Sequence, residues 1–324
     1  MEVRIATFNI YWFPSSTFIG NQRSEEDLRK IQEVIRRLDS DILVFEEILD
    51  LQALEHLIAD VMPERTYSLK DQDGHWAASA TTGNGMKVAL AFDRNKLEVL
   101  DVGAARLAGQ PPATQGKRDP VVARLRPLGG GPSFMVIGVH FKSGDLTVGP
   151  PVTSADFDRQ KEVANLSEWI RTTSPITPGN EARPKDEPTV LIGDFNAVRG
   201  NAALVPFAPG GDLATWPWPQ LRFATAMLPQ PVEFDPPLWD RWTTHLDRKI
   251  IDHVIVSPEV NLTDGPWAYA FDHDESWLHA AGVTEAWLEE PDYIFTPEDG
   301  DPAAKENLHH ITDHRPVRVT VKID

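Results

Sequence analysis

Side chains that can bind a cation or orient a water follow short apolar runs of the chain. In residues 189–196, Thr-Val-Leu-Ile-Gly-Asp-Phe-Asn, the three apolar residues 190–192 predict a short strand that is buried on both faces. Gly193 permits a tight turn and delivers Asp194 and Asn196 at the carboxyl end of this strand. A carboxylate and a carboxamide placed together can orient a water or bind a hard cation. A strand that closes in a simple Asx turn would give the same sequence.

Other apolar runs end in similar chemistry. The polar positions at these ends are Asn9, Glu47, His140, Asp194 with Asn196, Asp252, and Asp313 with His314. Each of them alone has a structural alternative, such as capping a turn or opening a helix, because buried polar groups usually find a hydrogen-bond partner. Their recurrence at one strand end after another favours a common functional site.

The elements that must position these residues are short strands with helices early and in the middle of the chain. Strands are expected at residues 3–10, 41–48, 88–92, 96–102, 121–125, 134–141, 190–193, 250–256 and 317–321, and helices at 24–38, 51–61 and 154–172. Strand 96–102 is expected to pair with 88–92 in a hairpin. The apolar members of the third helix are Phe157, Ala164, Leu166, Trp169 and Ile170. Helix 24–38 opens with a capping box, Ser24 followed by Asp27. This order predicts an α/β fold of two packed sheets flanked by helices.

No linker or internal repeat divides the chain, so residues 1–324 are expected to form a single domain. The acidic stretch at about 259–307, between the last two expected strands, is interpreted as an insertion. Residues 206–242 are rich in Pro and Trp and are expected to form an ordered covering loop. The tryptophans at 216, 218, 239 and 242 and the histidines at 245, 309 and 310 are open to substrate contacts or to ordinary loop packing.

Composition excludes several classes of site. The chain has no cysteine, which rules out disulfides, thiolate zinc sites and a thiol nucleophile. The formal net charge is −18, which disfavours long-range attraction to duplex phosphates unless a local basic groove reverses the field. No apolar run approaches the ~18 residues of a membrane-spanning helix, and the chain does not start with a signal-type segment. A monomer that is cytoplasmic, or secreted and processed, is therefore expected.

The order of these short motifs resembles a known family. The motifs are Thr7-Phe8-Asn9, Phe45-Glu46-Glu47, Arg118-Asp119-Pro120, Val139-His140-Phe141-Lys142-Ser143, Gly193-Asp194-Phe195-Asn196, Ile251-Asp252-His253 and Thr312-Asp313-His314. The series is similar to the endonuclease/exonuclease/phosphatase superfamily, which includes deoxyribonucleases, abasic-site endonucleases, neutral sphingomyelinases and inositol-polyphosphate phosphatases. The resemblance covers nearly the whole chain. It implies a four-layered α/β sandwich in which two mixed, mainly antiparallel sheets pack face to face.

The resemblance also implies a metal site. Glu47 would be the principal ligand, and Asn9 and Asp313 would lie near the same cation or a second one. All three offer oxygen donors, which match Mg²⁺ or Mn²⁺, as one or two ions, rather than a soft metal.

By the same resemblance, the residues around the attacked phosphate have separate roles. Asp194 would orient or deprotonate the attacking water, and Asn196 would hold the phosphate or a metal-bound water. His314 would contact the phosphate oxygens, with its ring fixed by Asp252 in a carboxylate–imidazole pair that favours the charged form.

Further residues implied by the resemblance lie on the leaving-group and substrate sides. His140 would act there as acid or hydrogen-bond donor, and Arg118 and Lys142 would bind substrate, Arg118 through a forked phosphate contact. Two departures stand out. Glu46 replaces a glutamine found in many members, which adds a carboxylate beside the metal site, and Met86 with Lys87 replaces a glutamate that partners the histidine of deoxyribonucleases.

These residues predict a divalent-metal-dependent phosphoester hydrolase, with a nuclease-like phosphodiesterase as the first reading. A phosphodiesterase or phosphatase acting on small molecules or lipid headgroups is the alternative, since the acidic net charge disfavours tight duplex binding. Arg118, Lys142, Arg159 and Lys161 could still line a short nucleic-acid track. A non-catalytic scaffold would show gaps among the metal and water-orienting positions, and the motifs have none.

Overall fold

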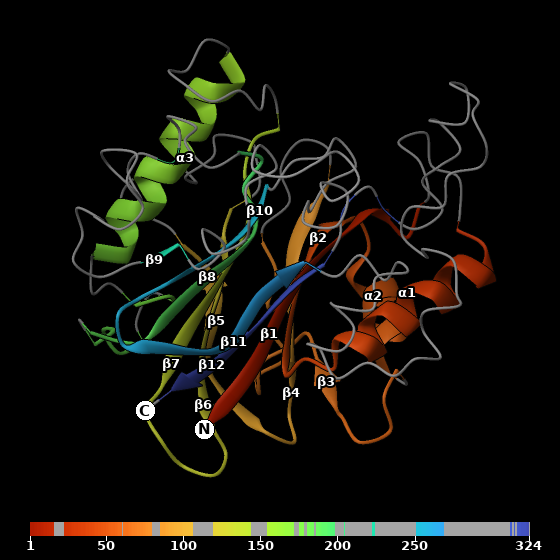
Figure 1. The fold of residues 1–324 in the computed structure, drawn as a ribbon, viewed down its shortest axis with the longest axis horizontal. Coiled ribbons are helices and arrows are strands. Elements are labelled where there is room, and N and C mark those ends of the chain that lie inside the picture. The colour runs from red at the N-terminus through yellow and green to blue at the C-terminus, as the bar shows by residue number, and fades with distance from the viewer. Residues whose placement is uncertain are drawn as a thin grey trace, which may run out of the picture.

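The computed structural model of the protein describes residues 1–15, 23–59, 61–79, 85–105, 119–143, 154–171, 175–177, 180–184, 186–197, 204, 222–223, 251–268, 312, 314 and 316–323. Two sheets form the centre of this part of the chain (Figure 1). The strands of the first sheet, in spatial order, are β11 (Val260–Ala268), β12 (Val317–Ile323), β1 (Glu2–Phe13), β2 (Ile42–Ile48), β4 (Lys87–Asp93) and β3 (Tyr67–Ser68). Those of the second are β5 (Leu97–Ala104), β6 (Val121–Pro127), β7 (Phe134–His140), β8 (Thr189–Asp194), β10 (Asp252–Val256) and β9 (Arg222–Phe223).

Each sheet contains one parallel pair among antiparallel ones. In the first sheet β1 is parallel to β2, and in the second β7 is parallel to β8. The other neighbouring strands, such as β1 with β12 and β8 with β10, are antiparallel. The mixed, mainly antiparallel character expected of both sheets is confirmed.

Three hydrophobic layers separate four layers of backbone. Between the sheets, Ile5 and Val44 of the first sheet belong to the same buried cluster as Val136 and Val254 of the second. On the outer face of the first sheet, α1 (Glu25–Leu38) and α2 (Leu51–Ala59) bury their apolar stripes against alternate strand residues. On the outer face of the second sheet, α3 (Ser154–Arg171) does the same (Figure 1). The four-layered α/β sandwich is therefore confirmed.

Local sequence signals account for the ends of α1, whereas the apolar residues of α3 lie on more than one face. Ser24 caps α1 in the expected capping box with Asp27, and Asp39 ends the helix in a left-handed conformation. On α3, however, Phe157 is 50% exposed, whereas Leu166 is buried. Nine residues at ~100° per residue place Phe157 on the side of the helix opposite Leu166, so the apolar members of α3 do not all face the sheet.

Two strand assignments also differ from expectation. Strand β5 does not form a hairpin with β4, because β4 pairs with β2 and β3 while β5 pairs with β6 in the other sheet. Both strands contribute to the cluster between the sheets, so their patterns look alike whichever sheet they join. Strand β11 falls inside the stretch interpreted as an insertion and pairs with β12. Residues 269–311 lie outside the described part of the chain, and the single domain with an insertion stays a prediction.

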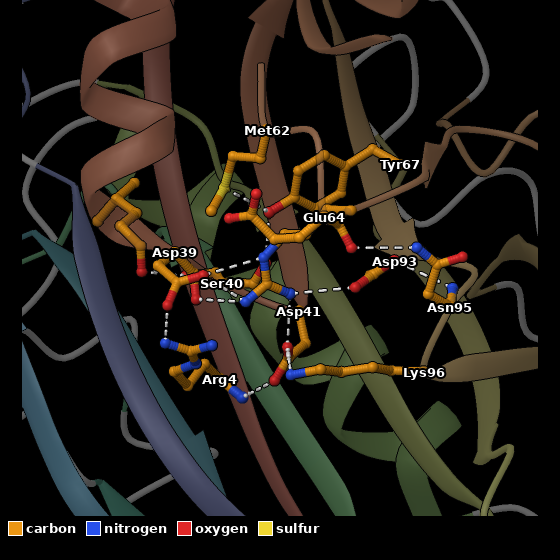
Figure 2. Close-up of polar contacts among 12 residues, drawn as sticks. Arg4, Asp39, Ser40, Asp41, Met62, Glu64, Tyr67, Asp93, Asn95 and Lys96 are labelled. Atoms are coloured by element: carbon orange, nitrogen blue, oxygen red, sulfur yellow. Dashed lines mark hydrogen bonds and ion pairs between the residues drawn. The ribbon is translucent and has the colours of Figure 1, made fainter. Parts of the chain in front are cut away.

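A network of buried charges stabilises the end of the first sheet at which β2 begins (Figure 2). The side chain of Arg65 is 3% exposed and forms ion pairs with Asp39, with Asp41 at 2.7 Å and with Asp93 at 3.2 Å. Burial opposes the charge of Arg65, but the hydrogen bonds to Asp41 and Asp39 outweigh it and raise its pKa above the ordinary value. Lys96 adds a second cation at 2.7 Å from Asp41.

Replacing Arg65 with methionine is expected to destabilise the fold by about 3–5 kcal/mol, because buried carboxylates would lose their partner. The measurement is the free energy of unfolding in urea. Arg126→Ala is the control, since this arginine is 46% exposed in its pair with Glu98 and should cost less than ~1 kcal/mol. Equal losses in the two variants would contradict a stabilising role of the buried network.

Candidate active site

Strand direction brings the polar strand ends to one end of the sandwich. Asn9 lies near the carboxyl end of β1, Glu46 and Glu47 on β2, His140 on β7 and Asp194 on β8, while Asp252 begins β10 and His314 precedes β12. Because β1 and β2 are parallel, as are β7 and β8, these ends coincide within each sheet. The antiparallel β10 and β12 start where their neighbours end.

A bulge in β2 directs two consecutive glutamates at the site. Phe45 is opposite Ala89 of β4 and Ile48 is opposite Lys87, so β2 has two residues between these pairs where β4 has one. Glu47 has a positive φ of 61°, which an L residue adopts only where the surrounding structure imposes it. Its Oε1 atom lies 3.4 Å from Asn9 Nδ2 and 3.6 Å from Nε2 of His140, which belongs to the facing sheet.

Gly193 is required by the close packing of β7 and β8. Its φ is +143°, and a Cβ atom there would lie 2.2 Å from the backbone oxygen of Val139. A side chain is therefore excluded by the neighbouring strand itself. The same Cβ would lie 3.0 Å from Glu46 Oε1, so the absence of a side chain also leaves room for a carboxyl group from the first sheet.

Asp194 is the centre of the site. Its Oδ1 atom accepts the backbone N–H of Asn196 at 2.7 Å. Its Oδ2 atom accepts from Asn196 Nδ2 at 2.9 Å and from Asn9 Nδ2 at 3.3 Å. The Nε2 atoms of two histidines point at the same oxygen, His140 at 3.3 Å and His314 at 3.7 Å. One carboxylate is thus oriented from both sheets.

The surroundings of Asp194 and Glu46 favour protonation of these carboxyl groups or a cation bound beside them. Burial raises the pKa of Asp194 to about 7, with the charges of Asp252 and Glu47 acting in the same direction and His314 and the Asn196 N–H opposing them. Burial also raises the pKa of Glu46 well above its ordinary value, together with the charges of Asp252 and Asp194 and against a hydrogen bond from Thr7. Burial of Glu46 therefore favours the protonated form of its carboxyl group.

His314 is oriented by Asp252. Its Nδ1 atom lies 2.9 Å and 3.2 Å from the two carboxylate oxygens, so Nε2 is directed to the site. The backbone N–H of His314 donates to Thr312 Oγ1 at 3.1 Å, and that hydroxyl donates to the carbonyl oxygen of Asn9 at 2.6 Å. This chain of contacts ties the segment before β12 to the end of β1.

Two of the residues expected to bind substrate lie at the margin of this cluster. The amide of Asn196 donates to Phe141 O at 3.1 Å as well as to Asp194. The ammonium of Lys142 lies 3.0 Å from the carbonyl oxygen of Ser143. Arg118 and Asp313, the other expected substrate and metal residues, lie outside the described part of the chain, as do the tryptophans at 216, 218, 239 and 242 and the histidines at 245, 309 and 310.

The donor chemistry of the site fits a hard cation, with one qualification. Glu47 and Asp194 present carboxylate oxygens, and their mutual repulsion would be relieved by a positive ion. Asn9, however, directs its amide nitrogen at these carboxylates, because its Oδ1 accepts the N–H of Tyr11 at 3.0 Å. In this arrangement Asn9 orients the carboxylates, and it would have to turn its oxygen inward to act as a ligand.

Sequence reasoning missed a buried ionic group on α3. Arg159, considered as a surface cation for nucleic acid, is 0% exposed, and Asp156 and Glu162 on the same helix are buried as well. Their spacing of three residues could have suggested a common helix face. Charge on a surface helix ordinarily indicates the solvated face, which is why the pattern was interpreted otherwise.

A third histidine of the motifs, His253, lies outside the cluster. It is buried, and its Nε2 donates to the carbonyl oxygen of Ala197 at 2.7 Å. Burial lowers its pKa from the ordinary 6.5 to about 4. The folded protein therefore keeps His253 neutral where the unfolded chain would protonate it.

This difference predicts a loss of stability in acid. The contribution of neutral His253 is fully present above pH 6.5 and is lost as the pH falls to about 4. Since one pH unit corresponds to ~1.4 kcal/mol, the contribution amounts to about 3 kcal/mol. His253→Gln retains a donor for Ala197 but cannot titrate, so its free energy of unfolding should fall less between pH 7.5 and 4.5 than that of the wild type. Parallel pH curves would contradict the assignment.

A separate group of acidic residues lies on the loop after β3. Ligand atoms of Asp71, Asp73 and His75 lie within 4.8 Å of one another. This group shares no residue with the cluster around Asp194, and its polar atoms bond among themselves. Exposed acidic loops of this kind are common without an ion.

Comparisons with known proteins agree with this architecture. A family model described as Endonuclease/Exonuclease/phosphatase family matches residues 6–267. The human Nocturnin catalytic domain, solved with bound sulfate, is 18% identical, with a TM-score of 0.56 over 100% of this chain and 95% of that one. D. rerio TDP2, solved with a single-strand DNA product, is 12% identical, with a TM-score of 0.56 over 99% of each chain.

A third neighbour is the mannosyl-6-phosphatase Bt3783 of Bacteroides thetaiotaomicron, which is 15% identical, with a TM-score of 0.51 over 99% of each chain. At these identities the likeness concerns the fold. No curated protein sequence matches the chain. None of the helices that the structure describes combines the length and apolar composition needed to cross a membrane.

Proposed function

The chain belongs to the endonuclease/exonuclease/phosphatase family, and from this premise we propose that it is a divalent-metal-dependent phosphodiesterase of the nuclease-like kind. Members of the family hydrolyse phosphoester bonds and generally depend on a divalent metal. The observation that carries the proposal is the convergence of Asn9, His140 and His314 on one carboxylate oxygen of Asp194, beside Glu47.

Hydrolysis needs a water that is aimed at phosphorus and loses its proton. Asp194 serves this step, because its orientation is fixed by Asn9 and Asn196 and its pKa of about 7 suits a base that works near neutral pH. His314, held by Asp252, donates a hydrogen bond to a phosphoryl oxygen as negative charge develops there. His140, which approaches Asp194 from β7, stabilises the leaving oxygen.

Glu47 and Asp313 would hold the cation, with Asn9 contributing if its amide turns. A bound Mg²⁺ or Mn²⁺ supplies positive charge that stabilises the phosphoryl oxygens in the transition state. Lys142, and by the same proposal Arg118, contact the substrate phosphate at the edge of the site.

The second candidate is a phosphatase or phosphodiesterase for small molecules or lipid headgroups. The net charge of −18 favours it, because a strongly acidic surface repels a long polyanion. The neighbours include both a mannosyl-6-phosphatase and a protein solved with a DNA product, so the fold is compatible with either class.

A substrate panel separates the two. Bis(p-nitrophenyl) phosphate, p-nitrophenyl phosphate, a single-stranded oligonucleotide and a supercoiled plasmid would each be assayed with Mg²⁺ and with Mn²⁺. The proposal expects cleavage of the diester and at least one nucleic acid with higher kcat/KM than the monoester. Preference for the monoester would favour the second candidate, and absence of hydrolysis on all four substrates with both metals would contradict the proposed function.

Removal of the metal is expected to abolish turnover. Charge stabilisation by a cation is worth several kcal/mol, so EDTA should lower the rate by about 10³-fold or more. Excess Mg²⁺ or Mn²⁺ should restore it, and should also raise the melting temperature because the ion binds the folded state. The checks are the initial rate and a thermal melt in the same buffers. Full activity after exhaustive chelation would contradict metal dependence.

A further inference from the structure

Helix α3 buries charged side chains where an amphipathic helix would bury apolar ones. In the carboxyl-terminal half of α3, the inner face packs Val163, Leu166 and Trp169 against the second sheet. The half toward the amino end instead buries Asp156, Arg159 and Glu162, each at 2% exposure or less. Burial of charge is costly unless each group is paired, so this half is built for specific contacts.

These contacts enclose one residue of the loop that follows β7. The backbone N–H of Lys142 donates to Glu162 Oε2 at 2.7 Å, and the carbonyl oxygen of Lys142 accepts from Arg159 Nε at 3.0 Å. Both polar groups of one peptide residue are thus bound by charged side chains from a single helix. Asp156 completes the group, because its Oδ1 accepts a hydrogen bond from Arg159 Nη1 at 3.0 Å.

The preceding residue is held from the other side. The backbone N–H of Phe141 donates to Asp194 O at 3.0 Å, and its carbonyl oxygen accepts from Asn196 Nδ2 at 3.1 Å. Strand β7 ends at His140, so these bonds replace the sheet ladder for the residues that follow. Residues 140–142 are therefore fixed between β8 and α3.

The segment fixed in this way carries two residues of the proposed mechanism, His140 and Lys142. Charge-assisted hydrogen bonds are shorter and stronger than neutral ones. Burial lowers the pKa of Arg159, but Asp156, Glu162 and Asp194 oppose this effect, so the guanidinium remains charged at neutral pH.

We propose that Arg159 and Glu162 are positioning residues for the reaction: they hold the Lys142 peptide so that His140 and Lys142 face the substrate phosphate. This inference rests on the proposed function for its catalytic consequence, while the geometry of the peptide can be tested without activity. Neither residue reaches the substrate. Their effect passes through the backbone between β7 and α3.

The test compares four variants of the full chain. Arg159→Met and Glu162→Leu each remove one hydrogen bond to Lys142. Glu162→Gln keeps an amide oxygen that can accept the Lys142 N–H, and is the conservative rescue. Lys161→Met removes a charge from the exposed face of the same helix and is the control.

Hydrogen exchange of the peptide that contains residues 139–143 is measured first, with no substrate present. Exchange should be about tenfold faster in Arg159→Met and Glu162→Leu than in Lys161→Met, and close to wild type in Glu162→Gln. This arm does not depend on turnover. Exchange in both disrupted variants at the rate of the control would overturn the proposal.

Kinetics with bis(p-nitrophenyl) phosphate and Mn²⁺ form the second arm. A misplacement of ~1 Å can cost 10²-fold, so kcat should fall about 10- to 100-fold in Arg159→Met and Glu162→Leu and recover to within about fivefold in Glu162→Gln. Affinity for Mn²⁺ should stay within about twofold of wild type, because Glu47 and Asn9 lie on the other sheet. Unchanged kcat despite faster exchange, or a parallel loss of Mn²⁺ affinity, would overturn the positioning role. An inactive wild type would instead contradict the proposed function.

Discussion

Asp194→Asn is expected to lower kcat for phosphodiester hydrolysis by about 10²–10⁴-fold, the usual contribution of a positioned general base. The substitution changes the shape of the side chain little, but it exchanges an oxygen for an amide nitrogen. Oδ2 faces the donors of Asn9, Asn196 and His140, so a nitrogen at this position would confront other N–H groups. The variant would also lack the basic group that takes the proton of the water.

Stability distinguishes loss of chemistry from loss of structure in this variant. Burial raises the pKa of Asp194 to about 7, above its ordinary 3.8. The stability gained by binding this proton is fully present below pH 3.8 and is lost as the pH rises through 7. At pH 8 the wild type without metal therefore bears an ionised carboxylate in a buried site, which the neutral asparagine avoids.

The metal-free variant should accordingly resist urea at pH 8 at least as well as the wild type. The measurements are kcat with saturating Mn²⁺ and the unfolding midpoint without metal. A rate near that of the wild type would show that Asp194 is not the base. A rate lost together with the fold would leave the loss explained by unfolding, which contradicts the electrostatic account above.

Features encoded locally could be predicted from the sequence. The capping box of Ser24 and Asp27 appears as expected, because it depends on atoms three residues apart. The short strand ending at Asp194 is buried throughout its length, as its continuous apolar run indicated. Polar residues at the ends of such runs come together because strands in a sheet run in only two directions. Several strand ends therefore lie at the same end of the sandwich.

Features that depend on which segments meet could not be predicted in this way. The pattern of β5 fits either sheet, and only the three-dimensional pairing with β6 assigns it to the second. Strand β11 lies in an acidic stretch, and its pairing with β12 is what makes it a strand. The burial of Arg159 depends on the Lys142 carbonyl, which is contributed by a different segment. Roles assigned to individual site residues remain predictions that kinetics must decide.

His314→Ala is expected to lower kcat by about 10²–10³-fold, the usual effect of removing one group that stabilises the developing charge on an oxyanion. Asp252 holds the ring through Nδ1 at 2.9 Å. Asp252→Asn should therefore act through His314, by weakening the fixed orientation and tautomer of its ring. Its loss of kcat should be smaller than that of His314→Ala.

The double variant His314→Ala with Asp252→Asn decides whether the pair acts as a unit. Residues that work through one another are strongly non-additive, so the double variant should be no slower than His314→Ala alone. His75→Ala is the matched control, since His75 is exposed and pairs only with a nearby loop carboxylate in the described structure. Independent roles would instead multiply the two losses.

Because Asp252 also raises the pKa of Asp194, its neutralisation should lower that pKa, and the acid limb of the pH–kcat profile of Asp252→Asn should move to lower pH. A shift in that direction would show that the Asp252–His314 pair and Asp194 are coupled electrostatically.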